Sequence, residues 1–190
     1  MHWTYCNIRN ISPEVLQDTY AQLTQSRKAH IDRLQQEQDK RRSLTGEFLA
    51  RKLLAEHYGD TTAQLHRKDN GQPYVTGRDL YVSIAHCNDL VACAIGSVPV
   101  GIDIEQIRPI TPALCRKVCV EEELDYLQLG NCENKRCQDP EVLRRFFEIW
   151  TAKEAYFKKC GTGITNLKSV NILTLPRQVH EIGDYILQII

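Results

Sequence analysis

Two carboxylates stand two positions apart in the segment PVGIDIEQIRP, at Asp103 and Glu105. They alternate with Ile102 and Ile104, which is the pattern of a β-strand, so the acids share one face and the apolar side chains fill the other. Like charges this close repel each other, and on a partly buried face either one carboxylate keeps a proton or a cation compensates both. A hard divalent ion such as Mg²⁺ suits the second solution. The plainer alternative is an edge strand with solvated acids.

A third carboxylate, Glu154, lies in a segment from Glu141 to about Cys160 that has the periodicity of an amphipathic helix. At about 100° per residue, Glu154 falls about 40° from Trp150, on the face that gathers the apolar and aromatic side chains. An unpaired carboxylate there costs several kcal/mol, so it requires a cation, a hydrogen-bond donor or a proton. Lys158, one turn on, is the ordinary partner and contributes only ~0.3–0.5 kcal/mol on an exposed helix. If Glu154 meets the strand pair, the three acids form an oxygen-ligand site for Mg²⁺ with room for a phosphate.

The elements that must position these acids follow from periodicity and turn residues. A long helix is predicted from Glu37 to Tyr58, stopped by Gly59. The run LYVSIAH, the turn CND and the run LVACAIG predict a β-hairpin that leads through a second turn into the acidic strand. Later elements are expected as a helix from residue 112 to about 130, a polar loop that ends at Pro140, the helix with Glu154, and strands at SVNILTL and DYILQII. Each half therefore mixes a helix with antiparallel strands, which predicts an α+β protein of two similar lobes, 1–99 and 100–190.

Composition limits the function classes. The chain has 190 residues, with 24 basic and 24 acidic side chains, so no bulk charge indicates nucleic acid or a membrane surface as partner. The first residues lack the pattern of a secretory signal and no apolar run is long enough to span a bilayer, so we expect a cytoplasmic protein. Its eight cysteines are expected to be reduced thiols. A zinc site from Cys115, Cys119, Cys132 and Cys137 is the weaker alternative, because neither pair has the compact C-x2-C spacing.

Two longer motifs make the chain recognisable. VGIDIE (Val100 to Glu105) and WTAKEAYFK (Trp150 to Lys158) resemble the two signature motifs of the 4'-phosphopantetheinyl transferases, in the expected order, and the chain is similar to the surfactin-synthetase-activating, Sfp-like type. Three weaker segments fit in register: DKRRSLTGEFLARKLL, NGQPYV and VSIAH. The family moves the phosphopantetheine arm of coenzyme A onto a serine of an acyl or peptidyl carrier protein, so the resemblance implies that reaction, that fold and coenzyme A as co-substrate.

The resemblance also implies roles for single residues. Asp103, Glu105 and Glu154 would hold Mg²⁺, and Lys158 would reach the pyrophosphate of coenzyme A with help from Lys153. Glu123 would be the base for the incoming serine, with a solvated helix start as the alternative for that residue. Residues implied at coenzyme A are Arg42 (or Arg41, if the register is off by one), His86, Gln72 and Pro73. The expected catalytic residues are Glu154, Lys158 and Glu123.

The chain departs from the family pattern at two positions near the nucleotide. Gln72 stands where the turn usually has lysine, and Ala85 where a serine usually precedes the histidine. We still expect an active, Mg²⁺-dependent transferase that is a monomer. The alternatives are a non-catalytic module that binds coenzyme A or a carrier protein, and another Mg²⁺-dependent phosphoryl-transfer enzyme. The first predicts no mass gain on a carrier protein, and the second predicts phosphate release from nucleotides without a carrier.

Overall fold

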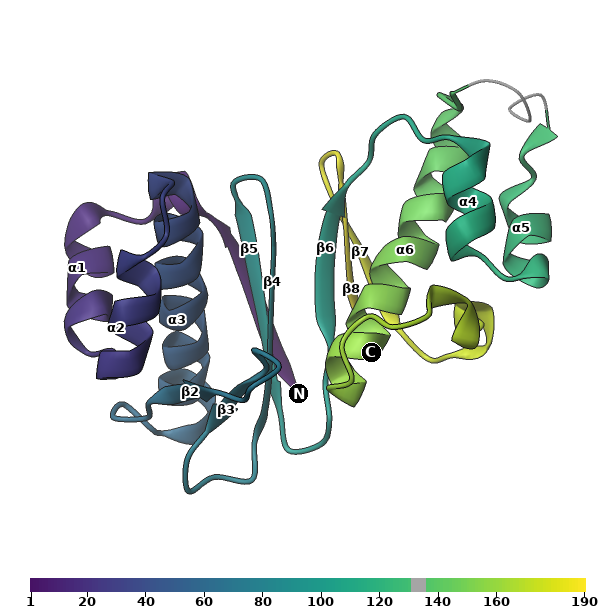
Figure 1. Cartoon of the computed structure of the whole chain (residues 1–190). Helices are drawn as coiled ribbons and strands as arrows, with labels where there is room; N and C mark the ends of the chain where they lie inside the picture. Colours follow the sequence, from purple (N-terminus) through teal and green to yellow (C-terminus); the bar gives the residue numbers. More distant parts are fainter. Residues whose placement is uncertain (131–135) are drawn as a thin grey trace.

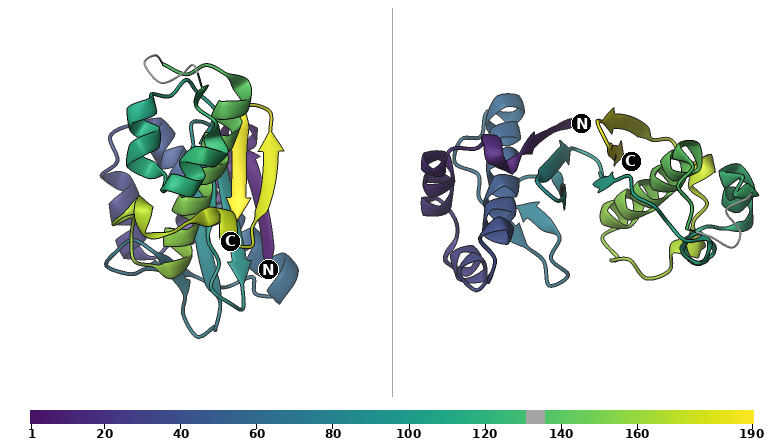
Figure 2. Two further views of the ribbon diagram at one scale, coloured as in Figure 1. Left: turned by 90° about the vertical axis from the view of Figure 1, so that its right-hand side faces the viewer. Right: turned by 90° about the horizontal axis from the view of Figure 1, so that it is seen from above.

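A computed structural model describes residues 1–130 and 136–190 and arranges them as two sheets between two helical layers (Figure 1). A five-stranded sheet and a three-stranded sheet pack face to face, and helices cover the outer side of each. The view from above shows the same order of layers (Figure 2). All strand pairs are antiparallel. The predicted α+β fold class is confirmed.

The N-terminal lobe holds the larger sheet, in strand order β1-β5-β4-β3-β2. The long helix predicted from Glu37 to Tyr58 is observed as α3 with these bounds, and Gly59 ends it with a φ of 64°, which glycine adopts without strain. The predicted hairpin is also observed, as β4 and β5. The elements of this lobe are β1 (His2–Asn7), η1 (Ile8–Asn10), α1 (Pro13–Ala21), α2 (Gln25–Asp32), α3 (Glu37–Tyr58), β2 (Leu65–Arg67), β3 (Pro73–Val75), β4 (Tyr81–Cys87) and β5 (Leu90–Gly96).

The C-terminal lobe holds the smaller sheet, in strand order β6-β8-β7, with α6 across it. The acidic strand is β6, and the helix that carries Glu154 is α6, which begins at Pro140 as expected from the N1 preference of proline. The elements are β6 (Ile102–Gln106), α4 (Pro112–Val118), α5 (Glu121–Leu127), α6 (Pro140–Cys160), η3 (Leu167–Ser169), η4 (Ile172–Thr174), β7 (Gln178–Ile182) and β8 (Tyr185–Ile189).

Two sequence-based expectations for this lobe are wrong, and one of its strands was not predicted. The single helix expected from 112 to about 130 is two helices, because Cys119 and Val120 are extended and Glu123 caps a new helix start at the Val120 amide. The strand expected at SVNILTL is a pair of 3-10 turns, each started by an asparagine side chain, Asn166 or Asn171, that accepts a backbone N–H bond. β7 was not predicted, since its sequence, QVHEI, is mostly polar and lies at the exposed edge of the sheet. Part of the polar loop before Pro140, residues 131–135, lies outside the described residues.

Three apolar clusters hold the layers together: one between α3 and the larger sheet, one around α6, and one between the two sheets. Ile102 and Ile104 are fully buried in the cluster between the sheets. The opposite face of β6 therefore turns Asp103 toward α6, as the alternation predicts. Among the described residues, no helix has the length and apolar character that crossing a membrane requires.

Gly101 allows β6 to begin directly against α6. A Cβ built on Gly101 would collide with the carbonyl group of Ala155, in the turn of α6 that follows Glu154. Because no other residue lacks a Cβ, only glycine permits this approach. The glycine of VGIDIE thus brings the acidic strand close to the helix that supplies the third acid.

Candidate functional site

Asp103 forms the buried centre of the acidic group. Its side chain comes from β6 and is 5% exposed, and Lys158 of α6 donates from Nζ to its Oδ1 atom at 2.6 Å. The second oxygen, Oδ2, is buried and has no hydrogen-bond partner among the described residues. A buried carboxylate oxygen without a donor is costly, so this atom offers a ligand an unused bond.

Burial raises the pKa values of two of the three predicted acids. Burial, together with the charge of Glu105, raises the pKa of Asp103 to about 6 against the opposing effect of Lys158. Burial raises the pKa of Glu154 to about 7, and the charges of Asp103 and Glu105 contribute to that rise. The ion pair of Lys158 with Asp103 joins α6 to β6 directly, whereas the meeting of all three acids at one ion stays a prediction.

Each of the two strand acids is engaged by a cation of the chain itself. Glu105 accepts a bond from Arg108 at 2.9 Å, and the Cys87 thiol lies 3.7 Å from the same oxygen. Lys158 engages Asp103 rather than forming the helical pair with Glu154 that its spacing allows. Within residues 1–130 and 136–190, no group of three or more His, Cys, Asp or Glu side chains is drawn together so that it could hold a metal ion. Cys115, Cys119 and Cys137 of the alternative zinc site therefore form no such group either in the described part of the chain. The fourth cysteine of that site, Cys132, lies outside the described residues.

A cationic pocket of about 230 Å³ lies beside the acidic group on the N-terminal lobe. Arg42 of α3 and His86 of β4 line it. Desolvation, reinforced by the charges of Arg42 and Lys158, lowers the pKa of His86, which places these three groups close together. The Nε atom of Arg42 is buried without a hydrogen-bond partner among the described residues. The pocket therefore offers positive charge and an unused donor to an anion.

Arg41 and Arg42 make different contacts. Arg41 donates to the backbone carbonyls of Ile8 and Ile11, both at 2.9 Å, so it holds the turn after β1. Arg42 is held by Asp39 at 2.8 Å and lines the pocket. The side chain at position 42 is therefore the one available to a ligand.

Further cations line this pocket that the sequence analysis missed. Arg27 of α2 and Arg67 of β2 both bind Glu47 of α3, which is almost fully buried, so two positive charges share one negative partner. His30 lies one turn from Arg27 on α2 and lines the pocket with them. Two features of the sequence could have indicated this pocket: the i,i+3 spacing of Arg27 and His30 in a short polar helix, and the acid Glu47 on the buried side of α3. A larger adjoining cavity of about 550 Å³ continues this basic surface.

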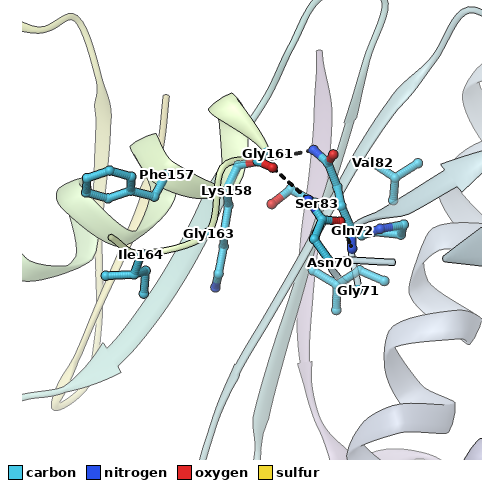
Figure 3. Close-up of a pocket in the computed structure, with 12 residues that line it drawn as sticks. Asn70, Gly71, Gln72, Val82, Ser83, Phe157, Lys158, Gly161, Gly163 and Ile164 are labelled. Atoms are coloured by element: carbon cyan, nitrogen blue, oxygen red, sulfur yellow. Dashed lines mark hydrogen bonds between the residues drawn. The ribbon is translucent and has the colours of Figure 1, made fainter. Parts of the chain in front are cut away.

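A narrow pocket of about 190 Å³ lies between the lobes, and Figure 3 shows the side chains around it. The turn between β2 and β3 forms one wall with Gln72, and the end of α6 forms the other with Lys158. Pro73, at the start of β3, also lines the pocket. This pocket shares Gly71, Pro73 and Ile84 with the cationic pocket, so the two adjoin. Gln72, Pro73, His86, Arg42 and Lys158 thus lie along one continuous cleft.

Glu123 and Lys153 do not join this cleft, which corrects two predicted site residues. Both side chains are 0% exposed and form an ion pair of 2.6 Å inside the C-terminal lobe. Glu123 also accepts bonds from the amides of Val120 and Ile172, and Lys153 donates to the carbonyls of Leu167 and Val170. A carboxylate enclosed in this way is neither accessible to an incoming serine nor a solvated helix start. The pair instead ties α5, α6 and the two 3-10 turns together.

Comparison with known proteins agrees with the motifs. The sequence pattern that defines the 4'-phosphopantetheinyl transferase superfamily matches residues 99–187. The chain is 36% identical over 128 residues to the 4'-phosphopantetheinyl transferase gsp of Aneurinibacillus migulanus, covering 66% of this chain and 51% of that protein. It is 33% identical over 130 residues to the 4'-phosphopantetheinyl transferase psf-1 of Bacillus pumilus, covering 67% of this chain and 53% of that protein. It is 28% identical over 172 residues to the 4'-phosphopantetheinyl transferase HetI of a Nostoc strain, covering 86% of this chain and 70% of that protein. The chain thus spans about half the length of the first two relatives.

Proposed function

We propose, since the chain belongs to the 4'-phosphopantetheinyl transferase superfamily, that it transfers the 4'-phosphopantetheine moiety of coenzyme A to a serine of an acyl or peptidyl carrier protein. The reaction would release 3',5'-ADP and convert the apo carrier into its holo form. One observation carries the proposal: the cationic pocket adjoins the pocket between the lobes, and Lys158, which lines the second pocket, forms an ion pair with the buried Asp103. Coenzyme A brings a pyrophosphate and a 3'-phosphate, which require such positive charge.

The cationic pocket supports binding of the coenzyme A phosphates. Arg42 and His86 are the predicted contacts, and Arg27, His30 and Arg67 extend the positive surface away from the acids. Arg27 and Arg67 share one negative partner, the buried Glu47, so one of their two positive charges remains available to a phosphate group. Pro73 and Gln72 would bound the nucleotide where the two pockets adjoin. A doubly phosphorylated ligand is therefore favoured over a singly charged one.

Mg²⁺ prefers hard oxygen donors such as these three acids, although the described part of the chain does not draw them together into a ligand group and its own cations engage two of them. Asp103 offers a buried oxygen without a partner among the described residues, and Glu105 and Glu154 would supply further carboxylate oxygens. We propose these three residues as the ligands. When bound, the ion would neutralise phosphate charge and stabilise the leaving group.

We propose that Lys158 and Glu154 perform the other steps of the reaction. Lys158 would move its ammonium group from Asp103 to the pyrophosphate and hold it in line with the carrier serine. The serine oxygen forms a bond to the phosphorus next to the pantetheine arm, and the bond from that phosphorus to the bridging oxygen of 3',5'-ADP breaks. Glu154, one turn before Lys158 on α6, is the carboxylate we propose as acceptor of the serine proton, in place of the enclosed Glu123.

The direct test is the mass of a carrier protein. The protein is incubated with coenzyme A, Mg²⁺ and several apo carriers, and each carrier is weighed by mass spectrometry. We expect a gain equal to one phosphopantetheine, lost when Mg²⁺ is replaced by a chelator. No gain on any carrier would overturn the transferase assignment and favour a binding module, whereas phosphate release from nucleotides without a carrier would favour another phosphoryl-transfer enzyme.

The proposal includes the organisation of the enzyme. The lobes 1–99 and 100–190 would act as one catalytic unit, because the cleft takes side chains from both. We propose that this unit works as a monomer in the cytoplasm, where it would meet coenzyme A and the apo carrier. Size-exclusion chromatography with light scattering would show a single-chain mass, and a stable dimer would contradict this.

A further inference from the structure

We propose that Asn70 and Gln72 form an amide clasp that fastens the N-terminal lobe to the end of α6 and thereby positions Lys158. The proposal rests on the proposed function for its kinetic part and on contacts in the structure for the rest. The nitrogen of Asn70 donates to the Gly161 carbonyl at 2.6 Å, and that of Gln72 donates to the Lys158 carbonyl at 3.2 Å (Figure 3). Two side chains of one turn thus bind the last turn of a helix about ninety residues later in the chain.

Each amide is oriented by its own turn. The Oδ1 atom of Asn70 accepts the Gln72 backbone N–H at 3.0 Å, and the Oε1 atom of Gln72 accepts from Lys68 Nζ at 2.9 Å. Backbone bonds between Lys68 and Gln72 and between Gly71 and Lys68 close the turn. With both oxygens occupied inside the turn, both nitrogens point outward to the other lobe.

The end of α6 is suited to receive these donors. The last carbonyls of a helix lack partners within it and carry the negative end of the helix dipole. Gly161 ends α6 with a φ of 68°, and a Cβ at that position would lie 2.7 Å from the Gln72 Oε1 atom. Glycine is therefore required twice over, for the backbone conformation and for the close approach of Gln72.

The clasp and the acidic group hold the same turn of helix from two sides. Gln72 binds the main chain of Lys158 from the N-terminal lobe, while Asp103 binds its side chain from β6. Loss of the clasp would free the last turn and let the ammonium group of Lys158 move relative to the pocket that it lines. Gln72 therefore acts as a positioning residue, through its amide.

This role explains why an amide serves here in place of a cation. A lysine at position 72 cannot accept the bond from Lys68, and it would place a second ammonium group beside that of Lys68. The chain thus exchanges one positive charge in the cleft for a link between the lobes, while Arg27 and Arg67 keep the neighbouring pocket positive.

Hydrogen exchange tests the clasp without relying on activity. In Gln72→Met, which keeps length and neutrality but removes donor and acceptor, we expect the backbone amides of residues 157–163 to exchange roughly three- to tenfold faster than in the wild type. Gln64→Met makes the same change at an exposed position of the same lobe and should leave them unchanged. Exchange in Gln72→Met that equals the wild type would overturn the clasp. Wild-type exchange in Gln72→Lys would overturn the claim that an amide is required.

A double-mutant cycle tests positioning. If the clasp acts through Lys158, Gln72→Met should lower kcat for phosphopantetheine transfer roughly three- to tenfold in the wild type and less than about twofold in a Lys158→Met background. An equal loss in both backgrounds would overturn the positioning role, because the clasp would then act elsewhere. A wild type with no transfer at all would overturn the proposed function, and the exchange experiment would still decide the clasp.

Discussion

Two ion pairs on helix α6 differ in how completely they are satisfied. Lys153 and Glu123 are both 0% exposed, and between them they bind four backbone groups as well as each other. Lys158 stands five residues further along α6, is 29% exposed and pairs with Asp103 of β6, one oxygen of which has no partner among the described residues. The first pair joins elements inside one lobe, whereas the lysine of the second lines the pocket between the lobes.

The difference teaches which buried charges serve the fold and which serve a ligand. Burying an ion pair is tolerated when each donor and acceptor is used, and it then holds its elements in one arrangement. A group that keeps an unused oxygen and a raised pKa has a net cost that a bound cation or phosphate could offset. The lysines of both pairs stand in the same motif, WTAKEAYFK.

The largest expected effect is a loss of folding stability when the Lys153–Glu123 pair is broken. Lys153→Met leaves Glu123 as a buried, uncompensated charge, so the free energy of unfolding should fall by about 3–5 kcal/mol in urea titrations. Lys117→Met, at an exposed position on α4, is the matched control and should change it by less than about 0.5 kcal/mol. A loss no larger than that of the control would mean that the Lys153–Glu123 pair does not support the fold.

The acidic group should instead make stability depend on pH. Its folded-state pKa values, about 6 for Asp103 and about 7 for Glu154, lie above the ordinary values of 3.8 and 4.5, so the folded chain binds protons more tightly than the unfolded one. This contribution is therefore fully present below about pH 4 and is lost as pH rises to about 7, by roughly 3 kcal/mol for Glu154 alone. Glutamine resembles the protonated acid, so Glu154→Gln and the wild type should be similarly stable near pH 4, and the variant should become the more stable of the two as pH rises to about 7, with a chelator present throughout. A difference that is constant with pH would contradict the burial of this group.

A smaller effect is expected on the cationic side of the cleft. His86→Ala removes a donor beside Arg42, and the dissociation constant for coenzyme A in a calorimetric titration should rise about tenfold. His57→Ala, at an exposed position at the end of α3, removes the same side chain far from the cationic pocket's lining and should leave it unchanged. If His86→Ala and His57→Ala bound coenzyme A with equal affinity, the phosphates of coenzyme A would have to lie outside the cationic pocket.

The sequence predicted those parts of the fold that depend on local periodicity. The bounds of α3 and the hairpin of β4 and β5 followed from apolar spacing and from stops such as Gly59. The meeting of Asp103 and Glu154 at one ion stays a prediction, because no group of three or more metal-ligating side chains is drawn together among the described residues. The 3-10 turns at Asn166 and Asn171 did not follow, since side-chain caps there override the strand pattern of SVNILTL.

Tertiary partners decided the rest of the site. Glu123 looked like a solvated helix start or a base, and only the fold shows that Lys153 and two amides enclose it. Arg27 and Arg67 are forty residues apart in sequence and meet only through Glu47. Gln72 stood out as a missing charge, whereas its contact with the Lys158 carbonyl depends on how the lobes pack.

Asp103→Asn tests the central claim most directly, when carrier modification and thermal unfolding are measured on the same sample. We predict that phosphopantetheine transfer falls on the order of 10²–10³-fold, while the midpoint of unfolding stays equal or rises because a poorly compensated buried charge is gone. Transfer at the wild-type rate by a folded Asp103→Asn protein would contradict the account.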